Sequence, residues 1–431
     1  MIFWLLGEAD YFGCCEKIIR ENNLKTSASI LHMKELNYFA KILKRNNSRF
    51  FILSCLPFLF LVDQILIIDL WSSRAGKTDS DSINLESCSF ESLSQKQQCW
   101  ENLIEKTLDK QGVDAALNLV SEMYNHSLEF SSDCHGFAHI LGQNAYKKYA
   151  DGDRFTLTPF TALCGYGFYH GFMENAFLLG GSFSELHDFC KNMSESLPGS
   201  LKNACQHGVG HGVVRYLTEG QASKYAGNGF NLSGESLKLC SDISNGSEEF
   251  YQGCINGVFM EISEELAVGI GGLVLDTQNP LEICHRQLAR DKKHCYGQMY
   301  VVLARVSADL KEGIEYIDKI NEDEYANEAI KNSVSIVGNR QDITEKINVC
   351  RSNSRLSEAC INGLAFAHIF HEPPGKEYQG ALEFCSSESL TQYEGARCID
   401  AILEYSFHAQ TSENHKQACS LAGDRYWKYC E

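Results

Sequence analysis

Proline and positive charge are both scarce in this chain, and each shortage excludes a class of protein. Only 6 of the 431 residues are proline, which argues against a collagen-like or proline-rich disordered chain. Lys and Arg number 38 against 56 Asp and Glu, for a net charge of −18. Because binding to nucleic-acid phosphates needs a basic face, we expect no nucleic-acid partner. An acidic chain is compatible with solubility and with cation binding.

Several motifs that identify a reaction are missing as well. The sequence has no CxxC pair, which removes the usual spacing of thiolate zinc sites and of haem attachment. The H-E-x-x-H pattern of zinc proteases is also absent. No glycine-rich phosphate loop, nucleophile elbow or dinucleotide fingerprint stands out. Whether the protein is an enzyme therefore stays open.

Cysteine, by contrast, is abundant, and sixteen of the 19 cysteines lie from Cys88 onward. They fall into near neighbours along the chain, and such regular spacing indicates disulfides formed in an oxidising compartment. Cys134 and Cys164 have no cysteine in the helix before them, and we predict that they bond to each other. The seven neighbour pairs are Cys88–Cys99, Cys190–Cys205, Cys240–Cys254, Cys284–Cys295, Cys350–Cys360, Cys385–Cys398 and Cys419–Cys430.

A basic segment followed by an apolar run marks the N-terminal part. Lysines and arginines between Lys34 and Arg49 precede an apolar stretch at residues 50–71, which is long enough to cross a membrane. Asp63 would cost about 2.5–3.5 kcal/mol near the centre of a span. We favour an uncleaved signal anchor, with a cleaved signal peptide as the alternative. In both cases the C-terminal part is exported to a periplasmic, extracellular or lumenal location.

This interpretation divides the chain into four segments. Residues 1–49 are expected to be cytoplasmic, and residues 1–32 can be an upstream extension, since a start just after them gives an ordinary basic signal segment. Residues 50–71 form the signal anchor or signal peptide. Residues 72–83 are a polar linker. Residues 84–431 form the exported domain.

The exported domain is predicted to be all-α. Amphipathic helices, such as residues 182–193, alternate with apolar, glycine-containing helices that the second cysteine of each pair opens. We call the cysteines of these apolar helices the second-helix cysteines. The intervals between them along the chain match the repeat lengths of helical-hairpin arrays. We therefore expect an array of disulfide-stapled helical hairpins, similar to an α-solenoid. In the chain-entropy model each bridge that closes a 15-residue loop contributes about 3 kcal/mol.

A short pattern recurs six times in this domain. A cysteine is followed by a glycine two or three residues later, with polar residues four apart around that glycine. On a helix these polar positions share one face. A glycine inside a helix costs about 1 kcal/mol relative to alanine, so its recurrence predicts close approach of a neighbouring backbone. The aligned glycines are Gly136, Gly167, Gly208, Gly257, Gly297 and Gly363.

The shared face is polar in an unusual way. A core face would be apolar and an ordinary solvent face rich in Lys and Glu, whereas this one carries His, Tyr and Asn. Such groups are typical of a binding surface. One helical turn further on, the face continues with Gln143, Glu174, Arg215 and Glu264. The six residues predicted to cluster are His135, His139, Tyr166, His170, His207 and His211.

Histidine pairs at i and i+4 can chelate one ion. Three histidines, or histidine with Glu174, suit zinc or another borderline metal when one position stays open. We take a divalent metal, with zinc as the first guess, as the predicted cofactor. The predicted metal ligands are His135, His139, His170, His207 and His211. The predicted ligand-binding residues are His135, Tyr166, His207, Glu174 and Arg215.

Three functions remain open. The first is a membrane-anchored, extracytoplasmic repeat protein that binds a metal or another small ligand on its His/Tyr face. The second is a metal-dependent enzyme, in which Glu174 would be the general base and Arg215 would stabilise an anion. The third is a structural or protein-interaction solenoid with buried histidines, whose partner would be another protein.

Overall fold

The computed structural model describes residues 88–90, 92–155, 159–194, 199–219, 222–227, 229–337, 341–371, 377–409, 412–422 and 430. These residues belong to one compact unit, Leu85–Glu431. The predictions for residues 1–49, 50–71 and 72–83 lie outside the described residues. Within the described ranges, no helix is both long and apolar enough to cross a membrane.

The described part of the chain is all-helical, as predicted, and it contains no β-strand. The first helices are α5 (Leu93–Gln111), α6 (Val113–His126), α7 (Leu128–Ala150), α8 (Gly167–Leu178), α9 (Phe183–Ser194) and α10 (Gly199–Thr218). The middle of the chain forms α11 (Ala222–Tyr225), α12 (Gly229–Ser244), α13 (Glu248–Val268), α14 (Glu282–His285), α15 (Ala289–Gln298), α16 (Tyr300–Val306), α17 (Leu310–Ile317) and α18 (Asp323–Ser333). The last helices are α19 (Ile343–Ser352), α20 (Ser357–His371), α21 (Glu377–Cys385), α22 (Gln392–Ala409) and α23 (Ser412–Ala422). Two 3-10 turns are η2 (Pro159–Ala162) and η3 (Ile270–Gly272).

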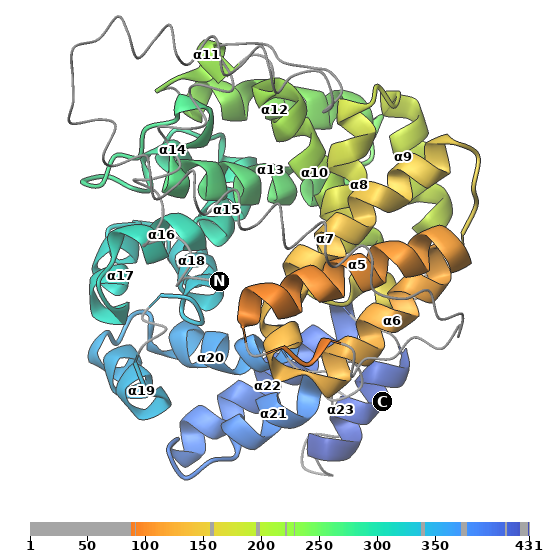
Figure 1. Ribbon diagram of the computed structural model, residues 1–431. Coiled ribbons are helices and arrows are strands. Elements are labelled where there is room, and N and C mark those ends of the chain that lie inside the picture. Colours follow the sequence, from red (N-terminus) through yellow and green to blue (C-terminus); the bar gives the residue numbers. More distant parts are fainter. Residues whose placement is uncertain are drawn as a thin grey trace, which may run out of the picture. The chain divides into compact units, whose positions relative to one another are not determined.

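One set of helices packs side by side in a row. Along it, α7 contacts α8, α8 contacts α10, α10 contacts α13, and the row continues through α15, α18, α20 and α22. Four members of the row each carry a shorter helix packed against them: α9 packs on α10, α12 on α13, α19 on α20 and α21 on α22. Figure 1 shows this order as the colours run from orange through green to blue. The helices that carry the predicted histidines, α7, α8 and α10, are therefore neighbours.

Local signals set the ends of two helices near the predicted site. Ser127 begins α7 and Ser247 begins α13, and each side chain accepts a hydrogen bond from the backbone N–H three residues later. Such a cap contributes about 1 kcal/mol because it satisfies a donor that the first helical turn leaves free. At its other end, α13 stops at Gly269, whose φ of 73° is a left-handed conformation that glycine adopts without strain.

All eight predicted disulfides are present, including the bridge between Cys134 and Cys164. The bonded cysteines have Cα atoms 5.4 to 5.8 Å apart. Cys190–Cys205 ties α9 to α10, and Cys134–Cys164 ties α7 to the turn before α8. This number of bridges is consistent with an oxidising, extracytoplasmic compartment.

The prediction that Cys164 opens a helix is wrong. Cys164, Gly165 and Tyr166 all have positive φ, at 63°, 62° and 67°, and α8 begins only at Gly167. Gly165 adopts a positive φ without strain, whereas Cys164 and Tyr166 do so at a steric cost, since both carry a Cβ atom. Tyr166 therefore precedes the helix and is not one of its face residues.

The cysteine pattern also missed one hairpin. The longest interval between second-helix cysteines runs from Cys295 to Cys360, and it contains α17 and α18, which pack on each other. In the row of helices, α18 lies between α15 and α20. No cysteine marks this hairpin, so a search on cysteine spacing could not find it. Its packing face uses small residues instead, because Ala326, Ala329 and Ser333 of α18 are fully buried.

Four glycines of the repeated pattern lie where a neighbouring backbone is closest, as predicted. A Cβ atom on Gly167, Gly208 or Gly363 would lie 2.5 Å from a carbonyl oxygen of the adjacent segment. A Cβ on Gly257 would collide with the carbonyl group of His207. These glycines allow neighbouring helices to approach more closely than any larger residue permits, and they bring together the side chains that flank them.

Gly136 and Gly297 differ from the other four. A Cβ on Gly136 would have Asp133 Oδ1 as its nearest neighbour, at 3.9 Å, which is an ordinary contact. A Cβ on Gly297 would meet the side chains of Asn332 and Glu328 at 3.0 and 3.1 Å, and no backbone. Backbone contact therefore explains most of the repeated glycines and leaves Gly136 without a packing reason.

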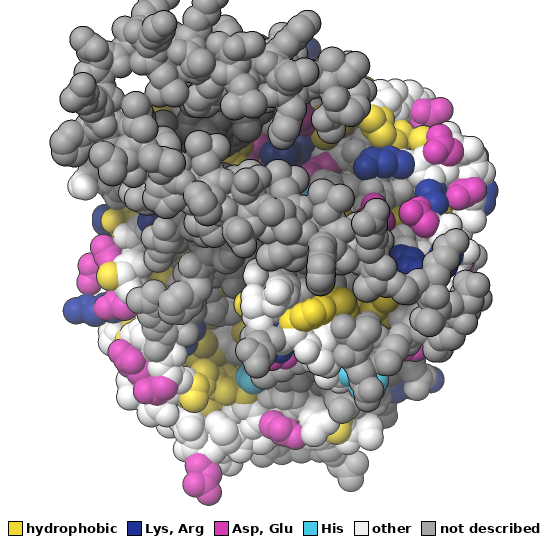
Figure 2. Space-filling view, viewed as in Figure 1, with side chains coloured by type: hydrophobic (Ala, Val, Ile, Leu, Met, Phe, Trp, Pro, Cys, Tyr) yellow, Lys and Arg dark blue, Asp and Glu magenta, His cyan; other side chains and the backbone are white. Residues whose placement is uncertain are grey.

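The described surface seen in Figure 2 carries acidic and basic side chains interspersed with apolar ones, and histidine occupies little of it. Of the six predicted face residues, His170 and His211 are each only 2% exposed, and the other four are half-buried. The polar face predicted from the sequence is therefore turned partly inward.

Candidate metal centre

Three neighbouring helices bring four imidazole rings together. His135 comes from α7, His170 from α8, and His207 and His211 from α10. The ring centroid of His170 lies 5.0 Å from that of His135, 5.1 Å from that of His207 and 3.9 Å from that of His211. We call these four residues the histidine cluster. The glycine contacts between α7, α8 and α10 make this convergence possible.

Ring nitrogens of three cluster members are close enough to hold one ion. The ligand atoms of His170, His207 and His211 all lie within 4.8 Å of one another. Nε2 of His207 is 3.1 Å from Nε2 of His211. Two nitrogens bound to one tetrahedral zinc at about 2.0–2.1 Å would be about 3.3 Å apart. The separation of the two Nε2 atoms is therefore compatible with a shared metal ion and also with a shared proton.

His170 has a buried nitrogen with no hydrogen-bond partner, namely Nε2. Its ring stacks on that of His211 with an interplanar angle of 17°. An unsatisfied buried polar group costs about 1–3 kcal/mol. A cation beside this nitrogen would remove that cost, and because an imidazole lone pair lies in the ring plane, the stacked rings of His170 and His211 must tilt apart to share one ion.

A carboxylate supports His211 from the other side of its ring. Nδ1 of His211 and Oε2 of Glu261 are 2.7 Å apart and share one proton. With a cation on Nε2, that proton stays on Nδ1 and Glu261 accepts it, which is the carboxylate–histidine–metal arrangement of many metal sites. Burial raises the pKa of Glu261 well above its usual range, so cation binding at His211 would release a proton.

His135 is oriented by the backbone. Its Nδ1–H donates to the carbonyl oxygen of Cys164 at 2.9 Å. Because a carbonyl can only accept, this bond places the proton on Nδ1 and leaves Nε2 as the free electron-pair donor. The left-handed turn at Cys164, Gly165 and Tyr166 thus supplies the carbonyl oxygen that orients His135.

Burial keeps the histidine cluster neutral. Desolvation is the largest effect that lowers the pKa of His170 and of His211 well below the ordinary value, and the neighbouring imidazoles add to it. Desolvation also lowers the pKa of His207 to about 4 and depresses that of His135. Neutral imidazole is the form that binds metals, so the cluster is ready to bind at physiological pH.

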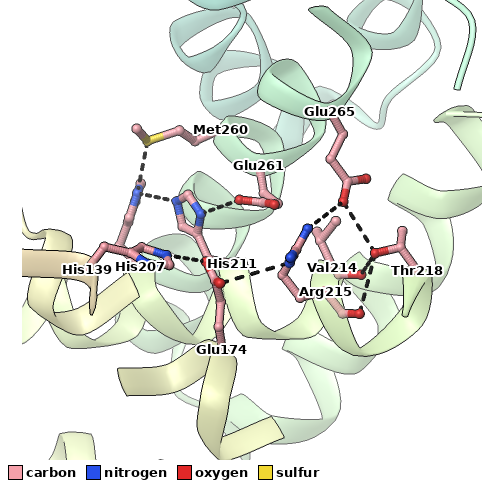
Figure 3. Close-up of polar contacts among 10 residues, drawn as sticks. All are labelled: His139, Glu174, His207, His211, Val214, Arg215, Thr218, Met260, Glu261 and Glu265. Atoms are coloured by element: carbon pink, nitrogen blue, oxygen red, sulfur yellow. Dashed lines mark hydrogen bonds and ion pairs between the residues drawn. The ribbon is translucent and has the colours of Figure 1, made fainter. Parts of the chain in front are cut away.

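Carboxylates outnumber cations beside the cluster. Glu174, Glu261 and Glu265 are buried, and burial raises the pKa of both Glu264 and Glu265 to about 7. Arg215 is the cation between them, with Nε 3.9 Å from Glu174 Oε2 and Nη1 4.0 Å from Glu265 Oε1, as Figure 3 shows. Buried carboxylates in excess favour either proton uptake or a bound cation.

The imidazole ring of His211 also belongs to a second possible group of metal ligands. Ligand atoms of Glu174, His211 and Glu261 lie within 4.8 Å of one another. His211 therefore stands between an imidazole-rich group and a carboxylate-rich group. The first suits borderline and soft ions, and the second suits harder ones.

The structure places the remaining predicted residues around the cluster. His139 lies beside it, with Nε2 3.0 Å from Glu174 Oε1. Arg215 is half-buried on the carboxylate side. Tyr166 is half-buried before α8, where desolvation raises the pKa of its hydroxyl and Tyr405 of α22 adds to that effect. Four of the six residues predicted to share a surface thus meet as one cluster, and His139 joins it through Glu174.

Sequence reasoning missed two contributors from α13. Met260 occupies the position where three earlier repeats carry histidine, and its Sδ is 3.2 Å from Nε2 of His207. Glu261 follows it and orients His211. A signal was present, since three carboxylates, Glu261, Glu264 and Glu265, follow closely on the apolar residues Val258 and Phe259 of one helix, and buried carboxylates of this kind mark functional sites.

A scan against protein-family models finds no match, and neither do searches of curated proteins and of solved structures. Function is therefore inferred from the geometry of the site.

Proposed function

We propose that this protein is a membrane-anchored, extracytoplasmic helical-repeat protein, similar to an α-solenoid, that binds a metal ion at the histidine cluster. The observation that carries the proposal is the unpaired, buried Nε2 of His170 beside the donor nitrogens of His207 and His211. Zinc is the first candidate among divalent ions, because three imidazoles are a common zinc ligand set. The eight disulfides support an oxidising compartment.

Three histidine ligands would leave a fourth coordination position. His135, whose Nε2 is free to donate, is one candidate for it, and water or a small ligand is another. The disulfides and glycine contacts hold α7, α8 and α10 together, so the helices that carry the ligands are already neighbours before the ion arrives.

A metal-dependent enzyme is the second candidate, and the carboxylates beside the cluster favour it. Glu264 and Glu265 have pKa values of about 7, and groups that titrate near the working pH suit general acid–base catalysis. Glu174 would be the general base and Arg215 would stabilise an anion. Turnover of small esters or phosphate esters by the metal-loaded chain, lost in Glu174→Gln with the metal retained, would favour this function.

We expect the full-length chain, purified without chelators, to hold about one transition-metal ion at the three-histidine site. Its affinity should fall as the pH falls through about 7, because cation binding releases a proton from the pair of Glu261 and His211, and because Glu264 and Glu265, with pKa values of about 7, lose their negative charge. The histidines add little to this dependence, since burial lowers the pKa of His207 to about 4 and depresses those of His170 and His211. Elemental analysis after dialysis over a pH series measures both quantities.

The control is the same chain unfolded in denaturant, because it carries the same residues without the arranged histidine cluster. A native chain that takes up neither zinc nor copper would leave the third function, a structural or protein-interaction solenoid with buried histidines, as the better interpretation.

The membrane anchor is tested separately. We expect protease added to intact cells, with any outer layer made permeable, to degrade residues 84–431, because the basic flank before residues 50–71 stays in the cytoplasm. Immunoblotting against the C-terminal part measures the loss, and a cytoplasmic protein serves as the control for lysis. Full protection of the C-terminal part would contradict the proposed topology.

A further inference from the structure

The fourth repeat replaces histidine by methionine at the position that contributes ligands elsewhere. Aligned on the glycine, the residue three positions later is His139, His170, His211 and then Met260. Close contact between Gly210 of α10 and α13 brings this methionine against the histidines. The thioether therefore enters a set of donors that is otherwise imidazole.

The sulfur points at a ring nitrogen that already faces another donor. Figure 3 shows Met260 Sδ directed at His207, and the distance from Sδ to Nε2 is 3.2 Å. The same Nε2 lies 3.1 Å from Nε2 of His211. One ring nitrogen has either one N–H or one lone pair, so a single proton cannot serve both neighbours well. A cation between the three atoms satisfies all of them.

Thioether sulfur discriminates between metals. Methionine is a soft ligand that favours Cu(I), whereas imidazole suits zinc and copper alike. Cu(I) accepts three or four ligands, so the imidazoles of His170, His207 and His211 and one thioether make a complete set, in which the Nε2 of His170 gains the partner it lacks.

We propose that Met260 is a ligand of the ion at the histidine cluster and that the site selects Cu(I) over zinc. This inference rests on the proposed metal-binding function and names its ion. The donors are His207 Nε2, His211 Nε2 and Met260 Sδ, with His170 completing the site. Glu261 holds His211 in the orientation that the ion needs.

The test compares Met260→Leu with the native full-length chain. Leucine keeps the size and apolar character of methionine and removes the sulfur. Met123→Leu is the matched control, because Met123 is a buried methionine of α6. Affinities are measured anaerobically, by competition with bicinchoninate for Cu(I) and with a chromophoric chelator for zinc.

We expect Met260→Leu to weaken Cu(I) binding on the order of tenfold or more and to change zinc affinity by less than about threefold. Met123→Leu should change neither affinity. Met260→His, which restores the histidine of the other repeats, should strengthen zinc binding. X-ray absorption of the native copper-loaded chain should show a sulfur neighbour at about 2.3 Å. That measurement needs no variant to fold.

Two results would count against the inference in different ways. The role of Met260 would be overturned if the native chain bound zinc with no preference for Cu(I), if X-ray absorption showed no sulfur neighbour, and if Met260→Leu had the same metal affinities as the native chain. That result would leave the proposed metal site in place. A native chain that binds neither ion would overturn the proposed function, and this inference with it.

Discussion

Replacing His170 with alanine is expected to lower metal affinity by about 100-fold or more, since changing a residue that only orients a metal ligand already costs about 10- to 100-fold. His170 sits between the other cluster members and has the buried nitrogen without a protein partner. Its removal takes away one of the donors that the proposed site needs. Elemental analysis and competition titration measure the loss.

The chain should remain folded in this variant. Truncation of one buried side chain costs about 1–3 kcal/mol, and the disulfides on either side of the cluster, Cys134–Cys164 and Cys190–Cys205, are untouched. His187→Ala is the matched control, because His187 also has a ring nitrogen without a partner but stacks on Phe250, outside the histidine cluster. Equal metal content in His170→Ala and the native chain would place the ion elsewhere.

Replacing Gly257 with alanine is expected to destabilise the chain by about 1–3 kcal/mol or more, because overpacking forces the backbone to move. The new Cβ would collide with the carbonyl group of His207, and a backbone carbonyl cannot rotate away. The helices α10 and α13 would separate, which moves Met260 and Glu261 away from His207 and His211. We therefore expect a lower denaturation midpoint and weaker metal binding together.

Gly136→Ala is the matched substitution at an equivalent position of the repeat. Its Cβ would meet nothing nearer than Asp133 Oδ1, at 3.9 Å. Alanine is a better helix former than glycine by about 1 kcal/mol, so this change should be neutral or stabilising. Denaturant titration of both variants gives the comparison. Equal destabilisation by the two substitutions would show that backbone contact does not explain Gly257.

Patterns that depend on neighbours in sequence were predicted well. The spacing of cysteines identified seven of the eight bridges, because a short loop between two helices brings their adjoining ends together. Cys134–Cys164 followed because these two cysteines alone had no neighbouring partner. The i and i+4 spacing placed His135 with His139, and His207 with His211, on common helical faces. The recurrence of glycine indicated close helix contacts at Gly257 and at three equivalent positions.

Features without such a local mark were missed. The hairpin of α17 and α18 lacks cysteine, and its small packing residues resemble those of many helices. Tyr166 was assigned to a helix, because only Gly165 hints at the left-handed turn that the chain adopts there, and Cys164 and Tyr166 are not residues that favour it. Met260 was visible in the alignment, but only the position of α13 against α10 shows that its sulfur faces His207.

The amino-acid sequence by itself determined the all-α class, the disulfide pairs and the helical faces that carry histidine, because each depends on spacing along one or two helices. The tertiary structure decided which atoms of those faces meet. It turned His139 toward Glu174, left His170 Nε2 without a partner, and added Met260 and Glu261 from α13. These outcomes depend on the rotation and closest approach of helices far apart in sequence, which result from the packing of the whole row rather than from any single segment.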